Sequence, residues 1–250
     1  MHIPDIRDIT SADLRILENR KYYFMHQSIG DNILDGVERL ANRIGKKAAI
    51  HRLDGNTASL HLKGPGFWHA YGGKNGKPLS KIDAFVAQMD RLGKNGSMPD
   101  VAMMKFCYLD FSASTDPEAV LDAYSEALKN LQSRFPDTRF VHMTAPIMAT
   151  PTDFRSRLKR LLGMSIWQDE TNIVRNRYNT LLRETYPARD IFDIAAIESL
   201  QSMTGEPPHV PGHPGVPALA PQLTYDGGHL NDAGREYAAV RFLEFLHTLQ

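Results

Sequence analysis

Residues 22–34 read YYFMHQSIGDNIL, and this stretch decides the fold because an apolar run passes directly into a helix. Four bulky side chains in a row, at residues 22–25, predict a strand that is covered on both faces of a sheet. Apolar residues then recur at helical spacing. They predict a helix that begins within three residues of Ser28, with Asp31 or Asn32 as its N-cap. Ser28 therefore lies in a strand-to-helix turn.

A serine in such a turn suits nucleophilic catalysis. The positive end of the helix dipole and the free N–H groups beside it would stabilise an oxyanion that develops next to Ser28. The alternative is ordinary turn chemistry, in which Ser28 hydrogen-bonds its own backbone and Gly30 adopts unusual dihedral angles. Both interpretations stay open on this stretch alone, and catalysis requires a partner elsewhere in the chain.

A candidate partner lies near the other end of the sequence. Asp226 precedes His229 by three residues, with Gly227 and Gly228 between them, and a helical pattern follows. This spacing lets a carboxylate accept from one imidazole nitrogen while the other nitrogen faces outward, which holds a general base in the correct tautomer. The alternative is a plain loop with a surface histidine. Together with Ser28, the pair favours a Ser-His-Asp site.

With these residues the chain resembles the SGNH (GDSL-like) hydrolase family. The family has a nucleophilic serine after the first strand, which Ser28 matches, and an Asp-x-x-His pair near the C-terminus, which Asp226 and His229 match. Residues 144–146, Thr-Ala-Pro after an apolar run, resemble the loop after the family's fourth strand. The resemblance spans roughly residues 20–245.

Two positions depart from the family pattern. Gln27 stands where an acidic residue usually precedes the serine, and the block that normally ends Gly-x-Asn-Asp reads CYLD at residues 107–110. Leu109 thus replaces the asparagine that completes the family's oxyanion hole, and its side chain cannot donate a hydrogen bond. By position, the family's second glycine should be Gly73, and Asn75 is a possible side-chain donor.

Residues 54–78 contain these two candidates and predict a glycine-rich loop rather than a regular element. The oxyanion hole is accordingly expected from the backbone of Ser28 and from this loop. The expected substrate contacts are Gln27, Trp68, His69 and Tyr71. A surface loop with incidental aromatic residues is the alternative.

Strands and helices alternate along the chain, which predicts a three-layer α/β/α sandwich with a flavodoxin-like parallel sheet. Ligands bind such sheets at the carboxyl ends of the strands, beside the first strand, where Ser28 lies. We expect one domain over residues 1–250, with an N-terminal extension at 1–20 and a proline- and glycine-rich loop at 203–223. The expected strands are at 22–25, 48–53, 101–109, 140–144 and 191–195. Numbered along the chain, they are expected to lie side by side in the sheet in the order 2-1-3-4-5.

Buried or paired polar groups are expected at a few positions. Lys105 interrupts the third predicted strand, so it should lie at the strand's end or pair with a carboxylate, the nearest in sequence being Asp110. His142 is expected to be a hydrogen-bonded core residue and Cys107 a packed one.

Composition excludes several function classes. Acidic and basic residues number 29 each, so no global field attracts nucleic acid. A single cysteine excludes a disulfide framework and a cysteine-rich zinc site, and neither His209 nor His213 has metal-ligand spacing. We expect no cofactor and no catalytic metal. The chain shows no apolar signal region and no transmembrane run, which predicts a soluble, cytoplasmic protein, or an exported one if a signal has been removed.

The resemblance implies a serine ester hydrolase that forms an acyl-enzyme on Ser28, with His229 as base and Asp226 as its orienting acid. Its expected partner is a small-molecule or saccharide ester, with an acetyl group on a carbohydrate as the favoured substrate. Two alternatives stay open. One is an acyltransferase of the same fold, and the other is a non-catalytic glycan-binding domain that lacks the oxyanion asparagine.

Overall fold

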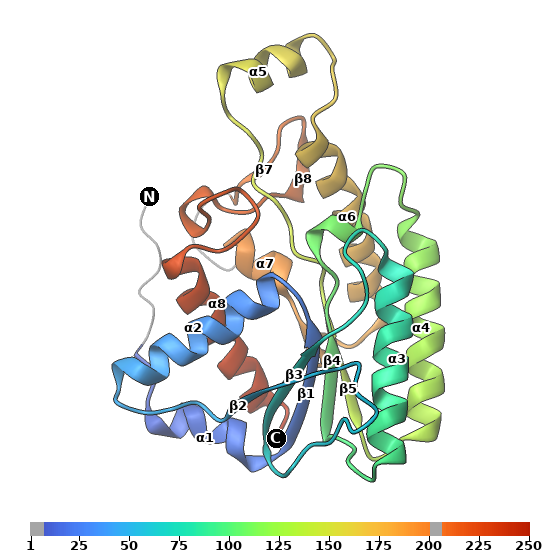
Figure 1. Cartoon of the computed structure of the whole chain (residues 1–250). Helices are drawn as coiled ribbons and strands as arrows, with labels where there is room; N and C mark the ends of the chain where they lie inside the picture. Colours follow the sequence, from blue (N-terminus) through green and yellow to red (C-terminus); the bar gives the residue numbers. More distant parts are fainter. Residues whose placement is uncertain (1–7, 201–206) are drawn as a thin grey trace.

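A parallel sheet runs through the middle of the molecule (Figure 1). The computed structural model describes residues 8–200 and 207–250. Over these ranges the sheet has six strands in the order β2-β3-β1-β4-β5-β6. The strands are β1 (Lys21–His26), β2 (Ile50–Leu53), β3 (Gly66–Tyr71), β4 (Val101–Met104), β5 (Arg139–Met143) and β6 (Ile191–Phe192). All neighbouring pairs in this sheet are parallel, as the alternation of elements predicts.

Helices cover both faces of the sheet, which confirms the three-layer sandwich (Figure 1). On one side lie α1 (Ser11–Asn19), α2 (Ile29–Arg43), α7 (Ile194–Glu198) and α8 (Asp232–Thr248). On the other lie α3 (Pro78–Lys94), α4 (Pro117–Arg134) and α6 (Trp167–Thr185). The remaining elements are α5 (Phe154–Leu161), an antiparallel hairpin of β7 (His209–Val210) and β8 (His213–Pro217), and the 3-10 turns η1 (Tyr108–Asp110), η2 (Ala188–Asp190) and η3 (Pro221–Leu223).

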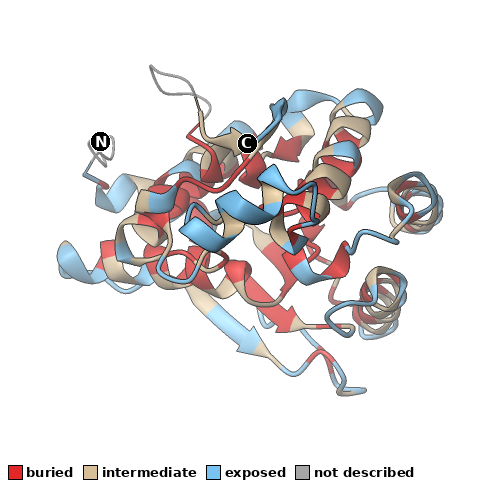
Figure 2. Ribbon diagram, turned by 90° about the horizontal axis from the view of Figure 1, so that it is seen from above, coloured by how far each residue is buried: buried red, intermediate tan, exposed pale blue. Residues whose placement is uncertain are grey.

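The residues of β1 show why two layers of helices are needed. Tyr22 and Phe24 pack into the cluster on the α2 side, and Tyr23 and Met25 pack into the cluster on the α3 side. All four are fully buried. Burying one such side chain contributes roughly 1.5–3 kcal/mol, so this strand holds both layers to the sheet. Figure 2 shows the buried strands between helices whose outer surfaces are exposed.

One predicted loop is a strand, and this corrects the strand order. Residues 66–71 form β3, which lies between β2 and β1, so the strand at 50–53 is at the edge and not beside β1. The strand was missed because glycine opens it and it has no β-branched residue, although it is buried on both faces. If β2 is set aside and β3 is counted as the second strand, the remaining five strands have the expected 2-1-3-4-5 order.

Several element boundaries also differ from the prediction. Helix α2 begins at Ile29, directly after Ser28, rather than after Asp31 or Asn32. Strand β4 ends at Met104 because the Asp110 carboxylate accepts the Cys107 N–H at 2.6 Å and bends the chain into η1. Strand β6 has two residues, and α7 follows it at once.

Other expectations are confirmed. Cys107 is a buried residue of the core, as expected. His142 is buried and hydrogen-bonded to the Tyr124 hydroxyl at 3.0 Å. Of the proline- and glycine-rich loop, residues 203–206 lie outside the described ranges. Within those ranges, none of the helices combines the length and the apolar character needed to cross a bilayer.

Candidate functional site

Ser28 occupies a strained turn between β1 and α2. Its φ is 56° and its ψ is −105°, a region that a residue with a side chain rarely adopts. The chain can therefore pass from strand to helix within two residues, Gln27 and Ser28. The strain falls on Ser28 itself, because Gly30 is not among the residues with positive φ. This result contradicts the simple turn chemistry in which Gly30 supplies the unusual dihedral angles.

The Ser28 hydroxyl is not used to hold this turn. It makes no cap hydrogen bond to α2, and its Oγ atom is buried without a hydrogen-bond partner among the described residues. A buried polar atom without a partner is uncommon and costs free energy, which in native proteins often marks a functional position. The Ser28 hydroxyl therefore has hydrogen-bonding capacity that the described residues do not use.

Two buried histidines lie beneath the turn. The His26 ring packs under the first turn of α2, where a Cβ atom on Gly30 would be 2.4 Å from it. His26 Nε2 is 2.9 Å from His69 Nδ1. Burial lowers the pKa of His26 well below its usual value and that of His69 to about 4. The pair is therefore neutral near pH 7, with one ring donating to the other.

Asp226 and His229 form the hydrogen-bonded pair that their spacing predicts. Asp226 Oδ2 is 2.7 Å from His229 Nδ1, and Oδ1 accepts the backbone N–H groups of Gly228 and His229. The tight loop requires Gly227, whose φ is +85°. Burial raises the pKa of Asp226, but the hydrogen bonds from His229 and Gly228 outweigh burial and hold this pKa below its usual value. Because the ionised carboxylate accepts a hydrogen bond from the Nδ1–H group, His229 Nε2 is left as the basic nitrogen.

A hydrogen bond joins this loop to the serine turn. Asn32, in the first turn of α2, accepts the backbone N–H of Leu230 at 3.0 Å. Asn32 also donates its own N–H to the Ser28 carbonyl, and Leu230 follows His229 directly. The asparagine that the sequence suggests as a helix cap therefore connects the residues that flank Ser28 and His229.

The glycine-rich segment is attached to the serine turn from the other side. Gln27 Nε2 donates to the Gly73 carbonyl at 3.2 Å. Gly73 has a φ of +68°, and a Cβ atom there would be 2.6 Å from the Lys81 Cα atom, so only glycine fits. Gln27 is partly exposed, and its side-chain amide holds the glycine-rich segment against the serine turn.

A buried ion pair joins the glycine-rich segment to η1. Lys81 Nζ is 2.8 Å from Asp110 Oδ2 and donates to Asn75 Oδ1 at 2.9 Å. Asp110 Oδ1 accepts the Gly76 N–H at 2.8 Å. Both charged side chains are fully buried. Asp110 therefore pairs with Lys81, whereas Lys105, for which Asp110 was the suggested partner, donates to the Phe106 carbonyl at 3.0 Å.

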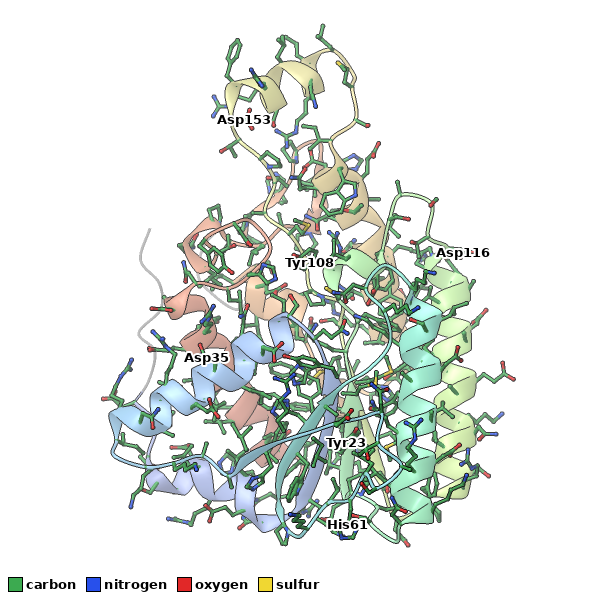
Figure 3. All side chains as sticks on the ribbon, in the orientation of Figure 1. Tyr23, Asp35, His61, Tyr108, Asp116 and Asp153 are labelled. Carbon is green, nitrogen blue, oxygen red and sulfur yellow. The ribbon has the colours of Figure 1, made fainter. Side chains whose placement is uncertain are left out.

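Tyr108 brings η1 against the histidine. The rings of Tyr108 and His229 are in edge contact, with centroids 5.7 Å apart, and Tyr225 stacks on the histidine's other side. The Tyr108 carbonyl accepts from the buried Arg175 guanidinium at 2.9 Å. In Figure 3, Tyr108 lies at the end of the sheet where the strands point. The serine turn, the glycine-rich segment, η1 and the Asp-x-x-His loop thus meet at the carboxyl ends of the strands.

Two of the expected substrate contacts lie away from any surface. Trp68 is buried, and its indole N–H donates to the Gly64 carbonyl, before the amino end of β3. His69 is buried against His26. Neither side chain is open to a substrate, because in a strand covered on both faces the aromatic residues pack into the core.

Tyr71, in contrast, lies at the carboxyl end of β3 and is partly exposed. It donates to Asp31 at 2.8 Å, and the Arg52 guanidinium lies 4.2 Å from its ring centroid. A cavity of about 400 Å³ opens beside it, lined by Arg52, Leu53, Asp54, Gly55, Asn56 and Tyr71. In the sheet register Tyr71 pairs with His26, two residues before Ser28.

Sequence reasoning missed Lys81 and Arg175, whereas it names Tyr108 and Lys105 as candidate oxyanion donors should Asn75 not serve. Lys81 had a usable signal, because it lies four residues before Phe85 on the apolar face of a predicted helix, where a lysine must be paired. Arg175 is fully buried within α6, where Asn172 and Thr171 accept from it, and no local pattern indicates this burial. Among the residues that the structure describes, no group of three or more His, Cys, Asp or Glu side chains is arranged to hold a metal ion.

Comparisons with known proteins bear on the fold. No family model and no curated protein sequence matches the chain. A solved structure from Streptococcus pneumonia, provisionally described as a platelet activating factor, matches 94% of this chain and 90% of its own with 13% identity and a TM-score of 0.50. The periplasmic domain of a lipopolysaccharide acetyltransferase from Salmonella ser. Paratyphi A matches 92% of this chain and 87% of its own with 12% identity and a TM-score of 0.44. The first match confirms the expected three-layer α/β/α fold.

Proposed function

We propose that this protein is a serine ester hydrolase that uses Ser28 as its nucleophile. The observation that carries the proposal is the Ser28 hydroxyl, which is buried, unpartnered within the described residues and held in a turn with positive φ. A structural serine would use its hydroxyl to cap the helix. A nucleophile instead needs a free hydroxyl at the start of a helix, close to a base.

In the first half of the reaction, His229 Nε2 takes the Ser28 proton and Ser28 Oγ attacks the ester carbonyl carbon. Asp226 stabilises the imidazolium that forms. The tetrahedral intermediate then collapses: its bond to the alcohol oxygen breaks, and His229 gives the proton to the leaving alcohol. The product is an acyl group on Ser28. In the second half, His229 activates water in the same way, and the carboxylic acid leaves.

The developing oxyanion is held by donors from two segments. The backbone N–H groups of Ser28 and Gly73 and the side-chain amide of Asn75 form the proposed hole, in the place of the family's asparagine. The Lys81 contact supports this role for Asn75, because an ammonium group can face only the amide oxygen. The NH₂ group of Asn75 is left to face a ligand.

For the substrate we propose a short acyl group, such as acetyl, on a carbohydrate or a related small alcohol. The support is the cavity beside Tyr71, whose lining includes a guanidinium, a carboxylate, an amide and an aromatic ring. Such a set can hydrogen-bond several hydroxyl groups and stack on a sugar face. Of the substrate contacts expected from the sequence, Tyr71 and Gln27 remain part of the proposal.

The experiment is active-site labelling of the full chain with a fluorophosphonate probe, together with the rate of hydrolysis of an aryl acetate. We expect the wild type to be labelled at Ser28 and to hydrolyse the ester. Ser28→Ala and His229→Ala should each lower kcat by up to roughly 10⁶, and Asp226→Ala by less, since the acid only orients and stabilises. Ser133→Ala, at an exposed serine of α4, is the matched control and should behave as the wild type.

Two outcomes would contradict the proposal. If Ser28→Ala hydrolysed every ester as fast as the wild type, the nucleophile would lie elsewhere. If the wild type bound sugars but took up no probe, it would be a glycan-binding domain. A third arm adds a sugar alcohol during turnover: release of free acid in preference to acylated sugar is the result expected of a hydrolase, and the reverse would show an acyltransferase.

A further inference from the structure

Helix α5 projects from the end of the molecule, and its apolar side chains are exposed. None of its residues is buried, and Figure 1 shows it standing beyond the β7–β8 hairpin. Phe154 is 79% exposed and Leu161 is 83% exposed, values that are unusual for large apolar side chains. The other exposed apolar residues of this region are Leu158, Leu162, Met164 and Trp167. We call residues 153–167 the α5 projection.

The side chains of α5 are sorted into two faces. Phe154, Leu158 and Leu161 recur at helical spacing and form one apolar stripe, which Leu162 extends. At 100° per residue, Arg155 and Arg157 fall on opposite edges of this stripe. Lys159 and Arg160 lie farther round on the polar side. The helix is therefore amphipathic and basic, with its apolar stripe facing solvent.

The projection is nevertheless a well-formed element with a fixed attachment. Asp153 caps the helix by accepting the N–H groups of Arg155 and Ser156, and Figure 3 places Asp153 on the projecting part, beyond Tyr108. Arg160 binds Asp169 and the Pro151 carbonyl, each at 2.8 Å. Arg160 thereby fastens α5 to α6 and to the incoming chain. In the described ranges, Arg155, Arg157 and Lys159 form no ion pair, so these three charges are available to a partner.

We propose that the α5 projection docks the protein onto the surface of an anionic phospholipid bilayer. The apolar stripe would enter the boundary between headgroups and acyl chains, and Arg155, Arg157 and Lys159 would contact lipid phosphates. A helix with aromatic and leucine side chains on one face and several cations beside them, but with low overall hydrophobicity, lies in the plane of such an interface. Trp167 adds a side chain that favours the same depth.

The shape and charge of the projection favour a bilayer over a protein partner. Helix α5 stands clear of the body (Figure 1), and none of its residues is buried, so its apolar stripe lies on the outside of a single helix and not in a groove between elements. A soft apolar layer beneath negative phosphates complements both the stripe and the cations on its edges. The main alternative is a second copy of this chain, whose groove between α3 and α4 carries Ile82 and Val86 with acidic residues beside them.

Docking would bring the proposed active site toward the membrane. The chain that leads to α5 is bonded to the Asp-x-x-His loop, where the Ala149 N–H donates to the Gly227 carbonyl at 2.9 Å. The projection and His229 therefore share one end of the molecule. Lipid binding itself does not depend on Ser28, so the two proposals fail separately.

The test is flotation of the full chain with vesicles of mixed phosphatidylcholine and phosphatidylglycerol, compared with vesicles of phosphatidylcholine alone. We expect flotation with the anionic vesicles and release at high salt. The double variant Leu161→Ser with Leu162→Ser should lower vesicle binding at least about tenfold. Changing Arg155, Arg157 and Lys159 to Gln should lower it by about fivefold per charge removed, and only for the anionic vesicles.

Matched controls come from other exposed positions. Leu79→Ser removes an exposed leucine of α3, and Lys129→Gln removes an exposed cation of α4. Both should float as the wild type does. All changed positions are exposed, and circular dichroism checks the fold of each variant. If the leucine variant misfolds, the charge variant still tests the proposal alone.

Three results would overturn the proposal. The first is a wild type that stays unbound with both kinds of vesicle. The second is equal flotation of the wild type and of the folded variants at α5, or a loss with Lys129→Gln as large as the loss per charge at α5. The third is self-association in light scattering that both the Leu161/Leu162 variant and Leu79→Ser abolish, because it would assign the stripe to the α3–α4 groove of a second copy.

Discussion

The ammonium group of Lys81 holds the side-chain amide of Asn75 in one orientation. Lys81 Nζ lies 2.9 Å from its amide oxygen and is itself fixed by Asp110. A buried ammonium group polarises the amide and makes its N–H groups stronger donors. Lys81 and Asp110 thus hold the proposed oxyanion donor, Asn75, in one orientation.

Two substitutions at Asn75 separate donation from packing. Asn75→Ala and Asn75→Asp should both lower kcat by about 10² to 10³ with KM nearly unchanged, because each removes an oxyanion donor. Aspartate keeps an oxygen for Lys81, so a purely structural role would make Asn75→Asp harmless. Steady-state kinetics on an aryl acetate measures both, with Asn130→Ala on α4 as control. Unaltered kcat in folded Asn75→Ala would move attention to the Tyr108 hydroxyl.

The residues that sequence reasoning placed well share one property. Ser28, Asp226 and His229 each lie at the boundary of an element or in a glycine turn, where the local sequence marks them. Lys81 and Asp110 form an ion pair between two separate segments, and although the position of Lys81 on an apolar helix face indicates that it is paired, no local pattern identifies Asp110 as its partner. Trp68 was misjudged because an aromatic residue between glycines looks like a loop residue.

At the scale of the elements, α2 packs closely against α8 at Gly36. A Cβ atom on Gly36 of α2 would lie 2.2 Å from the Arg235 carbonyl oxygen of α8. Backbone atoms cannot move aside as a flexible side chain can. This contact sets the distance between the helix that follows Ser28 and the helix that follows His229.

Gly36→Ala should therefore destabilise the protein by about 1–3 kcal/mol. The sign is informative, because alanine in place of glycine within an unobstructed helix stabilises by about 1 kcal/mol. Urea unfolding measures the change, and Gly215→Ala in β8, where a Cβ atom meets no neighbour, is the control. An increase in stability with Gly36→Ala would show that the two helices can separate at no cost.

The elements themselves were predictable where they carry local signals. Asp116 and Pro117 mark the start of α4, and apolar spacing marks α3 and α8. Strand β3 carries no such signal, since its burial comes from neighbours on both faces and not from its own pattern. The end of β4 at Met104 depends on the Asp110 side chain, which periodicity cannot register.

At the scale of the whole molecule, the fold buries ionisable side chains. Glu198, Lys105 and Arg175 are all fully buried. Burial raises the pKa of Glu198 to about 8, and burial lowers the pKa of Lys105 to about 8 and that of Arg175 to about 10. Glu198 Oε2 accepts the Ile147 N–H at 2.7 Å, while Oε1 has no partner among the described residues.

Glu198 should make stability fall as pH rises. Between its ordinary pKa of 4.5 and its native pKa of about 8, the folded protein keeps a proton that the unfolded chain has released. Its contribution is therefore complete below pH 4.5 and is lost as pH passes through about 8. The slope is at most about 1.4 kcal/mol per pH unit.

Glu198→Gln should remove this slope. Glutamine is neutral at every pH, and its oxygen can still accept the Ile147 N–H. The measurement is urea unfolding of wild type and variant at several pH values across the window. Other groups such as His69 contribute in the opposite direction, because a lowered pKa favours the folded state as pH rises. Their contribution is the same in both proteins, so it cancels when the free energy of unfolding of the variant is subtracted from that of the wild type. If the difference in free energy of unfolding between wild type and variant did not change with pH, Glu198 would be ionised in the native protein.

The position of α8 has a consequence for synthesis. Helices α1 and α2 are made early, yet their apolar faces are covered by α8, and the Arg20 guanidinium reaches the Leu249 carbonyl at 3.1 Å. A ribosome adds about 5–20 residues per second, so these faces wait for many seconds without cover and are open to chaperones throughout. His229 leaves the ribosome just before the same helix. The growing chain therefore acquires its proposed base and closes its hydrophobic layer in a single late event.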